Sequence, residues 1–584
     1  MAEQIVSPGV FTRENDQSFI TQQPVSVGAA IIGPTVKGPV EVPTVVTSYS
    51  EYKNKFGTTF VSESQTYSFL TSISAYNYFQ NGGQSLLVTR VASGSWTSAT
   101  SEDIQTNGVD GPGVLSTQPD ALLGSLGAVT GSAGDYTVSA SAYSGTTGTG
   151  FTASISLSDG DTVSSITVTN SETTGYKVGE TITIASGSLG YSAGDGDDLI
   201  ITLKADDILN KPAFTLKTIS EGIIQNSGEV AVDGKGALAS GSADNVRWEV
   251  TSADTDKGTF TINIRRGNDL HDEKVILETY ANVSLDPEQD NYIAKAIGDS
   301  YQVLKTDGTV KYLEVEGEYP NISNYVYVSE VNQHTAGYFD NNGNANSEYT
   351  ASIPQVGSGS FTGATGTILS GEGKFFDKIN NDDTQGLTAT DYDDAITLLN
   401  NKDEYQYNVI TAPGLIHSLS SHAGTLNTLI ANTQNRGDAL VVLDLEDYGA
   451  TVTAATTAAN ALNSSYAAAY WPWVQINNPD TGKLNWVPAS TLIPGVYAFN
   501  DANAEPWFAP AGINRGGLDT VVRPERKLTK GNRDTLYEAN VNPIASFPAN
   551  GTVVFGQKTL QKKASALDRV NVRRLLIALK SFIG

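Results

Sequence analysis

Cysteine is absent from the 584 residues of this chain, and histidine occurs only four times. Without cysteine there can be no disulfide bond, no thiol nucleophile and no cysteine-ligated metal. Long apolar runs are also missing, since none approaches the roughly 18 residues that a membrane-spanning helix needs. The first residues, "MAEQIVSPGV", carry neither the basic start nor the apolar stretch of a signal peptide. We therefore expect a soluble protein that is made in the cytoplasm and does not insert into a membrane.

Motifs for metal binding and catalysis are scarce as well. Asp195, Asp197 and Asp198 lie close together, but they lack the spacing and the distal glutamate of a calcium loop. The histidines form no H-x-x-x-H pair and join no nucleophile in a known motif. The four histidines are His271, His334, His417 and His422. The sequence therefore predicts solvated or core histidines and no metal site.

One stretch, "GTVVFGQKT" at residues 551–559, partly resembles a phosphate-binding loop. Gln557 displaces Lys558 by one position, and bulky residues stand where backbone amides would have to wrap a phosphate. Asp444 ends the strand-like "ALVVLDLED", as a metal-holding aspartate does, but it precedes this loop and so has the wrong order for a simple P-loop domain. We predict that the chain is not an enzyme and binds no cofactor.

What the sequence does contain is glycine, small polar residues and unevenly placed charge. The 57 glycines, with frequent serine, threonine, aspartate and asparagine, favour a β-rich and turn-rich architecture. The formal net charge is -27, yet residues 515–584 hold 13 lysines and arginines against five acids, a net charge of +8. The remaining 514 residues therefore carry -35, and this asymmetry suggests that the two parts face different partners.

The hydrophobic pattern predicts an α+β multidomain chain. A central α/β domain is expected from 23–95 joined to 375–499, because strand-like and helix-like stretches alternate there. Ser48 and Glu51 have the spacing of a helix capping box in this part. We also expect inserted β-rich domains and a C-terminal α+β domain that packs with the N-terminal arm. Residues 1–22 are predicted to form an extended arm. Residues 96–235 are predicted to form a β-rich insertion, and residues 236–374 a second, α+β insertion. Residues 500–584 are predicted to form the C-terminal domain.

The last stretch, "ALDRVNVRRLLIALKSFIG" at residues 566–584, predicts a basic amphipathic helix. At 100° per residue, Arg569, Arg573 and Lys580 lie within about 40° of one another. A separate apolar arc is predicted to pack on a core; its members are Val572, Leu575, Leu576, Leu579 and Ile583. Since no aromatic residues interleave with the cations and the whole chain is acidic, an acidic protein surface is a better partner for this stripe than nucleic acid.

Several stretches resemble one family, the contractile tail sheath proteins of tailed bacteriophages. The similar segments are "SPGVFTRE" (7–14), "GAAIIGPTVKGPVEVPTVVTSYSEYKNKFG", "NVSLDPEQDNYIAKAIGDS" (282–300), "YAAAYWPWVQI", "VPASTLIPGVYAFNDANAEPWFAPAGINRGGL", "RDTLYEANVNPIASFPANGTVVFGQKTLQ" and "LDRVNVRRLL". They follow the family's order over nearly the whole chain, whereas residues 96–235 match poorly, as a surface insertion would. The resemblance also gives the stretch at 551–559 a structural role.

The resemblance implies a structural subunit of the virion that assembles in the host cytoplasm. Its copies would form stacked hexameric rings around an inner tail tube, between the baseplate and the neck or terminator proteins. Contraction from a metastable extended state would drive the tube through the host envelope. The C-terminal domain would lie innermost, with Arg569, Arg573 and Lys580 against the tube protein.

Strand exchange between subunits is implied as well. An N-terminal arm containing Ser7, Pro8, Gly9, Val10 and Phe11 would add a strand to a neighbouring subunit. Family members continue past the final helix by something like a hundred residues. The resemblance therefore predicts either a truncated chain or a different closure of the lattice.

Two other functions stay open at this point. One is the sheath of a related bacterial contractile injection system or bacteriocin. The other is a β-rich surface adhesin, suggested by residues 96–235 and by the aromatic cluster Trp471, Trp473 and Trp486. For this cluster we favour core or interface packing over a carbohydrate platform, because aromatic side chains of this size bury a large area.

Overall fold

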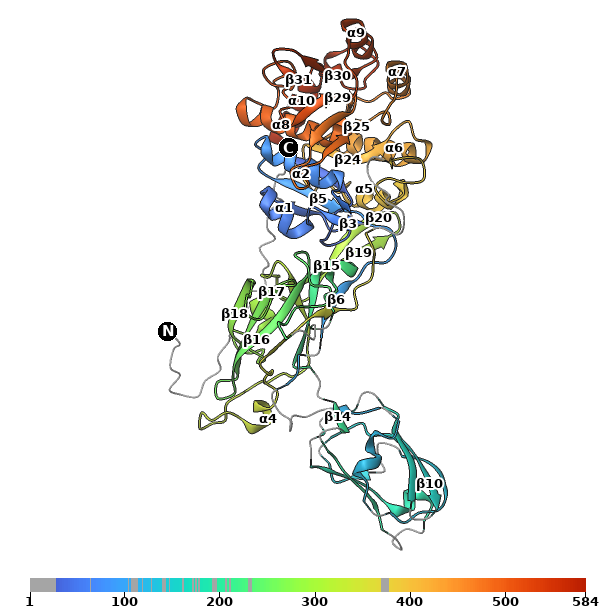
Figure 1. Cartoon of the computed structure of the whole chain (residues 1–584), viewed down its shortest axis with the longest axis vertical. Helices are drawn as coiled ribbons and strands as arrows, with labels where there is room; N and C mark the ends of the chain where they lie inside the picture. Colours follow the sequence, from blue (N-terminus) through green and yellow to red (C-terminus); the bar gives the residue numbers. More distant parts are fainter. Residues whose placement is uncertain are drawn as a thin grey trace.

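Three structural units follow one another along the long axis of the molecule (Figure 1). The α/β unit with α6, α8 and β25 lies at one end, a β-rich middle unit follows, and the smaller unit that contains β10 lies at the other end. This computed structural model describes residues 28–583 apart from 63–64, 103, 107–113, 118, 128, 139–142, 147, 160–161, 171–172, 174–175, 177–178, 192–196, 205–206, 210–211, 229, 231–233 and 369–377.

The α/β unit is built on an eight-stranded sheet in the order β2-β5-β1-β24-β25-β26-β30-β31. The six inner strands are parallel, and only the edge strands β2 and β31 are antiparallel to their neighbours. Ala30 lies opposite Ile410, so segments far apart in the sequence fold as one sheet. The strands are β1 (Ala29–Gly33), β2 (Thr44–Val46), β5 (Leu86–Arg90), β24 (Val409–Ile416), β25 (Leu440–Asp444), β26 (Ala467–Trp471), β30 (Val541–Phe547) and β31 (Gly551–Val554).

Helices cover both faces of this sheet, which explains why its strands read as continuous apolar runs. Along β1, Ala30 and Ile32 point into one core, and Ala29 and Ile31 point into the other. The first core is closed by α5 (Asp393–Leu398), α6 (Ser420–Arg436), α7 (Val452–Asn460) and α9 (Lys530–Glu538). The second is closed by α1 (Tyr49–Phe56), α2 (Leu70–Gln80), α8 (Ile493–Asn503) and α10 (Val570–Ile583).

The helix predicted after Ser48 is confirmed as α1. The Ser48 hydroxyl accepts a hydrogen bond from the Glu51 backbone N–H at 3.1 Å, which satisfies one of the free donors of the first turn. The Glu51 carboxylate accepts from the backbone N–H of Thr47 at 2.8 Å, one residue before the capping residue. The cap therefore forms as predicted, with a one-residue shift in its second hydrogen bond.

The sheet crosses the boundary that the sequence placed at residue 500. We expected 500–584 to form a separate C-terminal domain, but β30 and β31 extend the same sheet beyond β26. The buried Asn542 amide on β30 donates to the carbonyl oxygens of Ala469 at 3.1 Å and Lys558 at 2.8 Å. These long-range hydrogen bonds, invisible in a local pattern, join the last part of the chain to the parallel strands.

The middle unit packs two four-stranded sheets around one core, which includes Phe214, Trp248 and Phe260. It begins before residue 235, contrary to the predicted boundary, because two strands from the 96–235 range belong to it. One sheet contains β6 (Ser98–Ser101), β15 (Phe214–Glu221), β21 (Val326–Val331) and β23 (Phe361–Thr362). The other contains β16 (Val246–Asp254), β17 (Thr259–Arg266), β18 (Ile276–Ser284) and β22 (Gly357–Gly359).

The outer unit has its own hydrophobic core, which includes Phe151, Ile155 and Ile182. Where the chain leaves and re-enters the middle unit, the Ala213 N–H donates to the Ile104 carbonyl at 2.9 Å, so the two linkers start side by side. Its two three-stranded sheets are β8 (Gly134–Val138), β10 (Ala153–Asp159) and β11 (Thr162–Val168), and β9 (Tyr143–Ser144), β12 (Thr181–Ile184) and β13 (Leu199–Thr202). A short pair, β7 (Val114–Leu115) and β14 (Ile208–Leu209), accompanies them.

A hairpin from the middle unit reaches back onto the α/β unit. It is formed by β19 (Tyr301–Asp307) and β20 (Val310–Glu316), and Leu304 and Leu313 pack against the core below α5. Lys311 pairs with Asp394 at 3.1 Å.

No helix among the described residues has the length and hydropathy of a membrane span. The remaining strands and α-helices are β3 (Phe60–Ser62), β4 (Gln65–Tyr67), α3 (Ile293–Ile297), α4 (Ser347–Thr350), β27 (Val474–Asn477), β28 (Leu484–Val487) and β29 (Val521–Pro524).

Candidate interaction surfaces

The C-terminal helix α10 packs with a face that differs from the predicted one. Among the α10 residues whose burial is described, the buried ones are Val570, Arg573, Arg574 and Ile577. The predicted apolar arc is instead half-buried or exposed, and the exposed fraction rises from 40% at Leu576 and 43% at Leu579 to 81% at Ile583. The prediction that this arc packs on the core is therefore wrong for the described chain.

Arginine stacking explains this reversal. The Arg573 guanidinium lies 3.9 Å from the Tyr466 ring centroid, and its Nε donates to the Ser465 carbonyl at 3.1 Å. Arg574 lies 4.8 Å from the Tyr497 ring centroid and forms an ion pair with Asp501. A flat guanidinium on an aromatic face buries its apolar stem while its N–H groups stay hydrogen-bonded. Burial also lowers the pKa of Arg573.

The three cations of the predicted stripe therefore differ in accessibility. Arg573 is only 7% exposed, so its charge faces the interior of the folded chain. The Arg569 side chain is 41% exposed, although it pairs with Asp568 at 3.1 Å and stacks on Tyr537. Lys580 is exposed and donates to the Arg436 carbonyl at 3.2 Å. Arg569 and Lys580 keep surface that a partner can reach.

The other predicted interaction segment cannot be placed. Ser7, Pro8, Gly9, Val10 and Phe11 lie outside the described residues. The inter-subunit arm therefore stays a prediction from the sequence.

Within the described part of the chain, no three histidine or acidic side chains form a group that could hold a metal ion. His422 is buried, and its Nδ1 accepts from the Ile416 backbone N–H at 3.1 Å. Burial lowers the pKa of His422 and of His417. His422 is therefore a hydrogen-bonded core residue, and His417 is a half-buried residue near the surface.

The stretch resembling a phosphate loop has a structural explanation. Gly551–Val554 is strand β31, and the Val554 N–H donates to the Gly516 carbonyl at 2.7 Å. The Lys558 N–H donates to the Asn542 side chain, and its ammonium lies 4.6 Å from the Tyr537 ring centroid. Backbone amides that hold a sheet edge in this way are not free to surround a phosphate.

A buried carboxyl lies at the carboxyl end of strand β25. Asp444 ends β25, is 3% exposed, and accepts hydrogen bonds from the backbone N–H of Ser490 at 3.0 Å and from its hydroxyl. Burial raises the pKa of Asp444 to about 7, and the two hydrogen bonds oppose this rise. The sequence singled out this aspartate by its place after an apolar strand, but it holds the segment containing Ser490 against the sheet.

The tryptophan cluster is mostly core, as predicted. Trp471 and Trp473 are 1% and 4% exposed, and Trp473 donates from Nε1 to the Glu446 carbonyl at 2.9 Å. Trp486 is half-buried and lies 5.2 Å from the ring centroid of Tyr448, which is exposed. Within this cluster, Trp486 is the tryptophan that presents aromatic surface, together with its neighbour Tyr448.

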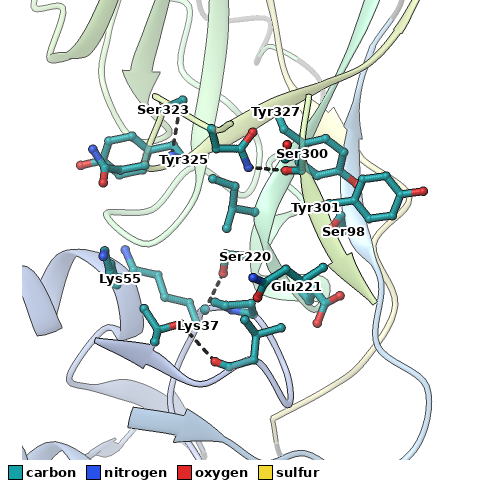
Figure 2. A pocket seen from close by; sticks show the side chains of 18 of the residues that line it. Lys37, Lys55, Ser98, Ser220, Glu221, Ser300, Tyr301, Ser323, Tyr325 and Tyr327 are labelled. Carbon is teal, nitrogen blue, oxygen red and sulfur yellow. Dashed lines mark hydrogen bonds between the residues drawn. The ribbon is translucent and has the colours of Figure 1, made fainter. Parts of the chain in front are cut away.

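A cavity of about 850 Å³ lies between the α/β unit and the middle unit (Figure 2). Lys37 and Lys55 lie on one wall, and Tyr301, Tyr325 and Tyr327 lie on the other. The Lys37 ammonium pairs with Asp244 of the middle unit at 3.4 Å, and burial lowers its pKa.

Hydrogen bonds between the α/β unit and the middle unit connect residues at one side of this cavity, and we call this connection the hydrogen-bonded joint. Gly38 donates from its N–H to the Ser220 hydroxyl at 2.7 Å, and Val40 donates to the Glu221 carboxylate at 2.9 Å. The buried Arg90 guanidinium donates to the carbonyl oxygens of both Gly38 and Glu221. A residue other than glycine at position 38 would be strained, because its φ is +107° and an added Cβ would meet the Phe56 ring at 2.7 Å. The geometry suits a fixed junction between units.

Comparison with known proteins shows which proteins part of this chain resembles. Residues 385–560 match the family model of the phage tail sheath protein central domain. The tail sheath protein of Vibrio phage KVP40 is 43% identical over 99 residues, which cover 17% of this chain and 15% of that protein. The tail sheath protein of Enterobacteria phage T4 is 38% identical over 99 residues, with the same coverage. The alignments thus span less than a fifth of the length of these curated relatives.

Solved sheath structures are also similar. The sheath complex of an extracellular contractile injection system in its contracted state has a TM-score of 0.27 and 25% identity, covering 34% of this chain and 50% of that chain. A sheath tail protein from Listeria innocua has a TM-score of 0.42 and 8% identity, covering 95% and 74%. Residues 385–560 match the phage tail sheath central domain. Together with the curated matches, this confirms the resemblance of the chain to the contractile tail sheath proteins of tailed bacteriophages.

Proposed function

We propose that this chain is a structural subunit of a contractile tail sheath in a phage virion. The observation that carries the proposal is the family match over residues 385–560, since this range contains β24, β25, β26, β30 and β31 of the central sheet. The curated relatives are phage proteins, which favours a phage tail over a bacteriocin or another bacterial injection system.

In this proposal the subunits form stacked six-fold rings around an inner tube, between the baseplate and the neck. Assembly would trap an extended state, and contraction would repack rigid units into larger interfaces and release the stored free energy. No nucleotide or cofactor is needed for such a step, so the chain would act without catalysis. The hydrogen-bonded joint at Gly38 and Arg90 supports rigid transmission of movement between units.

The contacts with neighbours are proposed at two places. The tube-facing stripe would contain Arg569, Arg573 and Lys580, with Arg569 and Lys580 as its accessible members and Arg573 holding the helix in place. Exposed ion pairs of this kind are weak and salt-sensitive, which suits contacts that must break when a sheath widens. Residues 7–11 would reach a neighbouring subunit.

Electron microscopy of the purified chain tests the function directly. A sheath subunit should polymerise, alone or with its tube protein, into tubes whose length varies while their diameter stays constant. A surface adhesin of the β-rich class would stay monomeric or form small closed oligomers. Discrete small particles at every protein and salt concentration would reject the sheath proposal.

A further inference from the structure

The cations of the C-terminal part of the chain are mostly not neutralised by acids. Of the 13 lysines and arginines between 515 and 584, only Arg569 and Arg574 form ion pairs within the described structure. The arginines contact aromatic rings more often than carboxylates, because each of the seven arginines of this range lies over a ring. The seven pairs are Arg515–Phe508, Arg523–Trp486, Arg526–Trp471, Arg533–Phe547, Arg569–Tyr537, Arg573–Tyr466 and Arg574–Tyr497.

Stacking on a ring has a different consequence from ion pairing. A neutral ring holds the guanidinium plane and restricts its motion, but it leaves the full positive charge and the N–H edge for another partner. A fixed guanidinium edge is suited to bidentate recognition of a carboxylate, since little side-chain freedom remains to be lost on binding.

One short segment concentrates these cations at the surface. Residues 523–533, "RPERKLTKGNR", contain five lysines and arginines and a single acid, and we call them the basic segment. Arg523, Lys527 and Lys530 are exposed, and Arg526 and Arg533 are half-buried. The segment joins β29 to the first turn of α9, at the end of the molecule farthest from the outer unit (Figure 1).

The segment is held rigidly. The Arg523 Nε donates to the Gln475 side chain at 2.8 Å while its guanidinium lies 5.3 Å from the Trp486 ring centroid. Arg533 lies 5.3 and 5.6 Å from the ring centroids of Phe547 and Phe555 and donates to the Leu528 carbonyl at 3.3 Å. The backbone itself is paired, since the Glu525 N–H donates to the Trp473 carbonyl at 2.8 Å.

The one acid of the basic segment makes no ion pair with its cations in the described structure, and the segment keeps a formal net charge of +4. The Glu525 carboxylate accepts from the Gly449 N–H at 2.8 Å, and its second oxygen is buried without a partner. Asp534 and Glu538, farther along α9, make no ion pair with the segment in the described structure. The α9 N-terminus, capped by Thr529, adds partial positive charge at Lys530.

We propose that the basic segment is a docking surface for carboxylates of a second copy of this chain. Charge complementarity supports this occupant, because residues 1–514 of each copy carry a net charge of -35. The exposed Tyr448 beside Trp486 and Arg523 adds aromatic contact area, and tyrosine, tryptophan and arginine are the residues that dominate protein interfaces. The inference rests on the proposed sheath function and assigns one of its subunit contacts.

The test is self-assembly of the full chain at different salt concentrations, followed by light scattering and electron microscopy. The triple variant Arg523→Gln, Arg526→Gln and Arg533→Gln should raise the critical concentration for assembly by about tenfold at low salt. The effect should fade near 0.5 M salt, where the screening length is only about 4 Å. The matched control, Lys558→Gln, Lys562→Gln and Lys563→Gln, removes the same charge elsewhere and should assemble like the wild type.

Folding and charge are separated by a second variant. Arginine-to-lysine replacements at 523, 526 and 533 keep the charge but lose the planar guanidinium edge, so they should restore only part of the assembly. Melting temperatures of all variants show whether each chain is folded. The inference is overturned if the wild type forms tubes and a folded glutamine variant assembles like its control. A wild type that forms no tubes under any condition overturns the proposed function as well.

Discussion

Asp444 offers the sharpest quantitative test of the packing described above. Its carboxyl is 3% exposed at the end of β25, and its hydrogen-bond partners are the backbone and hydroxyl of Ser490. No lysine or arginine pairs with it among the described residues. Burial without a cation raises the pKa of Asp444 to about 7, whereas an unfolded aspartate titrates near ~3.9.

The direction of the pH dependence follows from this difference. Because the folded chain holds the Asp444 proton more tightly than the unfolded chain, the contribution is fully present below about pH 4 and is lost as the pH rises through about 7. Three pH units at about 1.4 kcal/mol each correspond to ~4 kcal/mol of unfolding free energy. Between pH 5 and pH 8 the loss is about 2–3 kcal/mol.

The variant Asp444→Asn isolates this contribution, because asparagine has nearly the same shape and stays neutral. Urea unfolding of the α/β unit can be followed by tryptophan fluorescence, since Trp471 and Trp473 are buried there. Relative to the wild type, the variant should gain about 2–3 kcal/mol between pH 5 and pH 8. Asp447→Asn, which removes an exposed charge from the same loop, is the control. Parallel stability curves for wild type and Asp444→Asn would refute the reasoning.

Three further outcomes are expected. Ile577→Ala should lower the unfolding free energy by about 2–4 kcal/mol, whereas Leu579→Ala should cost less than ~0.5 kcal/mol, and equal losses in thermal melts would contradict the packing of α10. Arg574→Ala should cost about 1–2 kcal/mol by removing a buried side chain that lies over Tyr497 and pairs with the half-buried Asp501, and a melt unchanged from the wild type would argue against these contacts. Replacing residues 106–211 by a short glycine-serine linker should leave the melting of the α/β unit unchanged, because Ile104 and Ala213 are already hydrogen-bonded; aggregation of this shortened chain would count against an independent outer unit.

Local features were predicted well from the sequence. The cap at Ser48 depends on residues within one helical turn, and the buried strands read as continuous apolar runs because helices cover both faces. The same logic identified Trp471 and Trp473 as core. In each case the deciding interaction is either local or a simple matter of burial.

The errors came from contacts between distant residues. A helical wheel treats arginine as polar, so it could not anticipate that Arg573 and Arg574 stack on Tyr466 and Tyr497 and displace Leu576 and Leu579 to the surface. The boundary expected at residue 500 failed for the same reason, since the Asn542 amide joins β30 to β26 across more than 70 residues. The basic segment was visible as charge, but its ring contacts were not.

The most direct test of the sheath proposal is the rotational symmetry of assembled tubes. End-on views of polymerised chain, averaged without imposed symmetry in electron cryomicroscopy, should show six subunits per ring around a central channel. Tubes with another rotational order, or a chain that remains monomeric with its own tube protein present, would contradict the proposal.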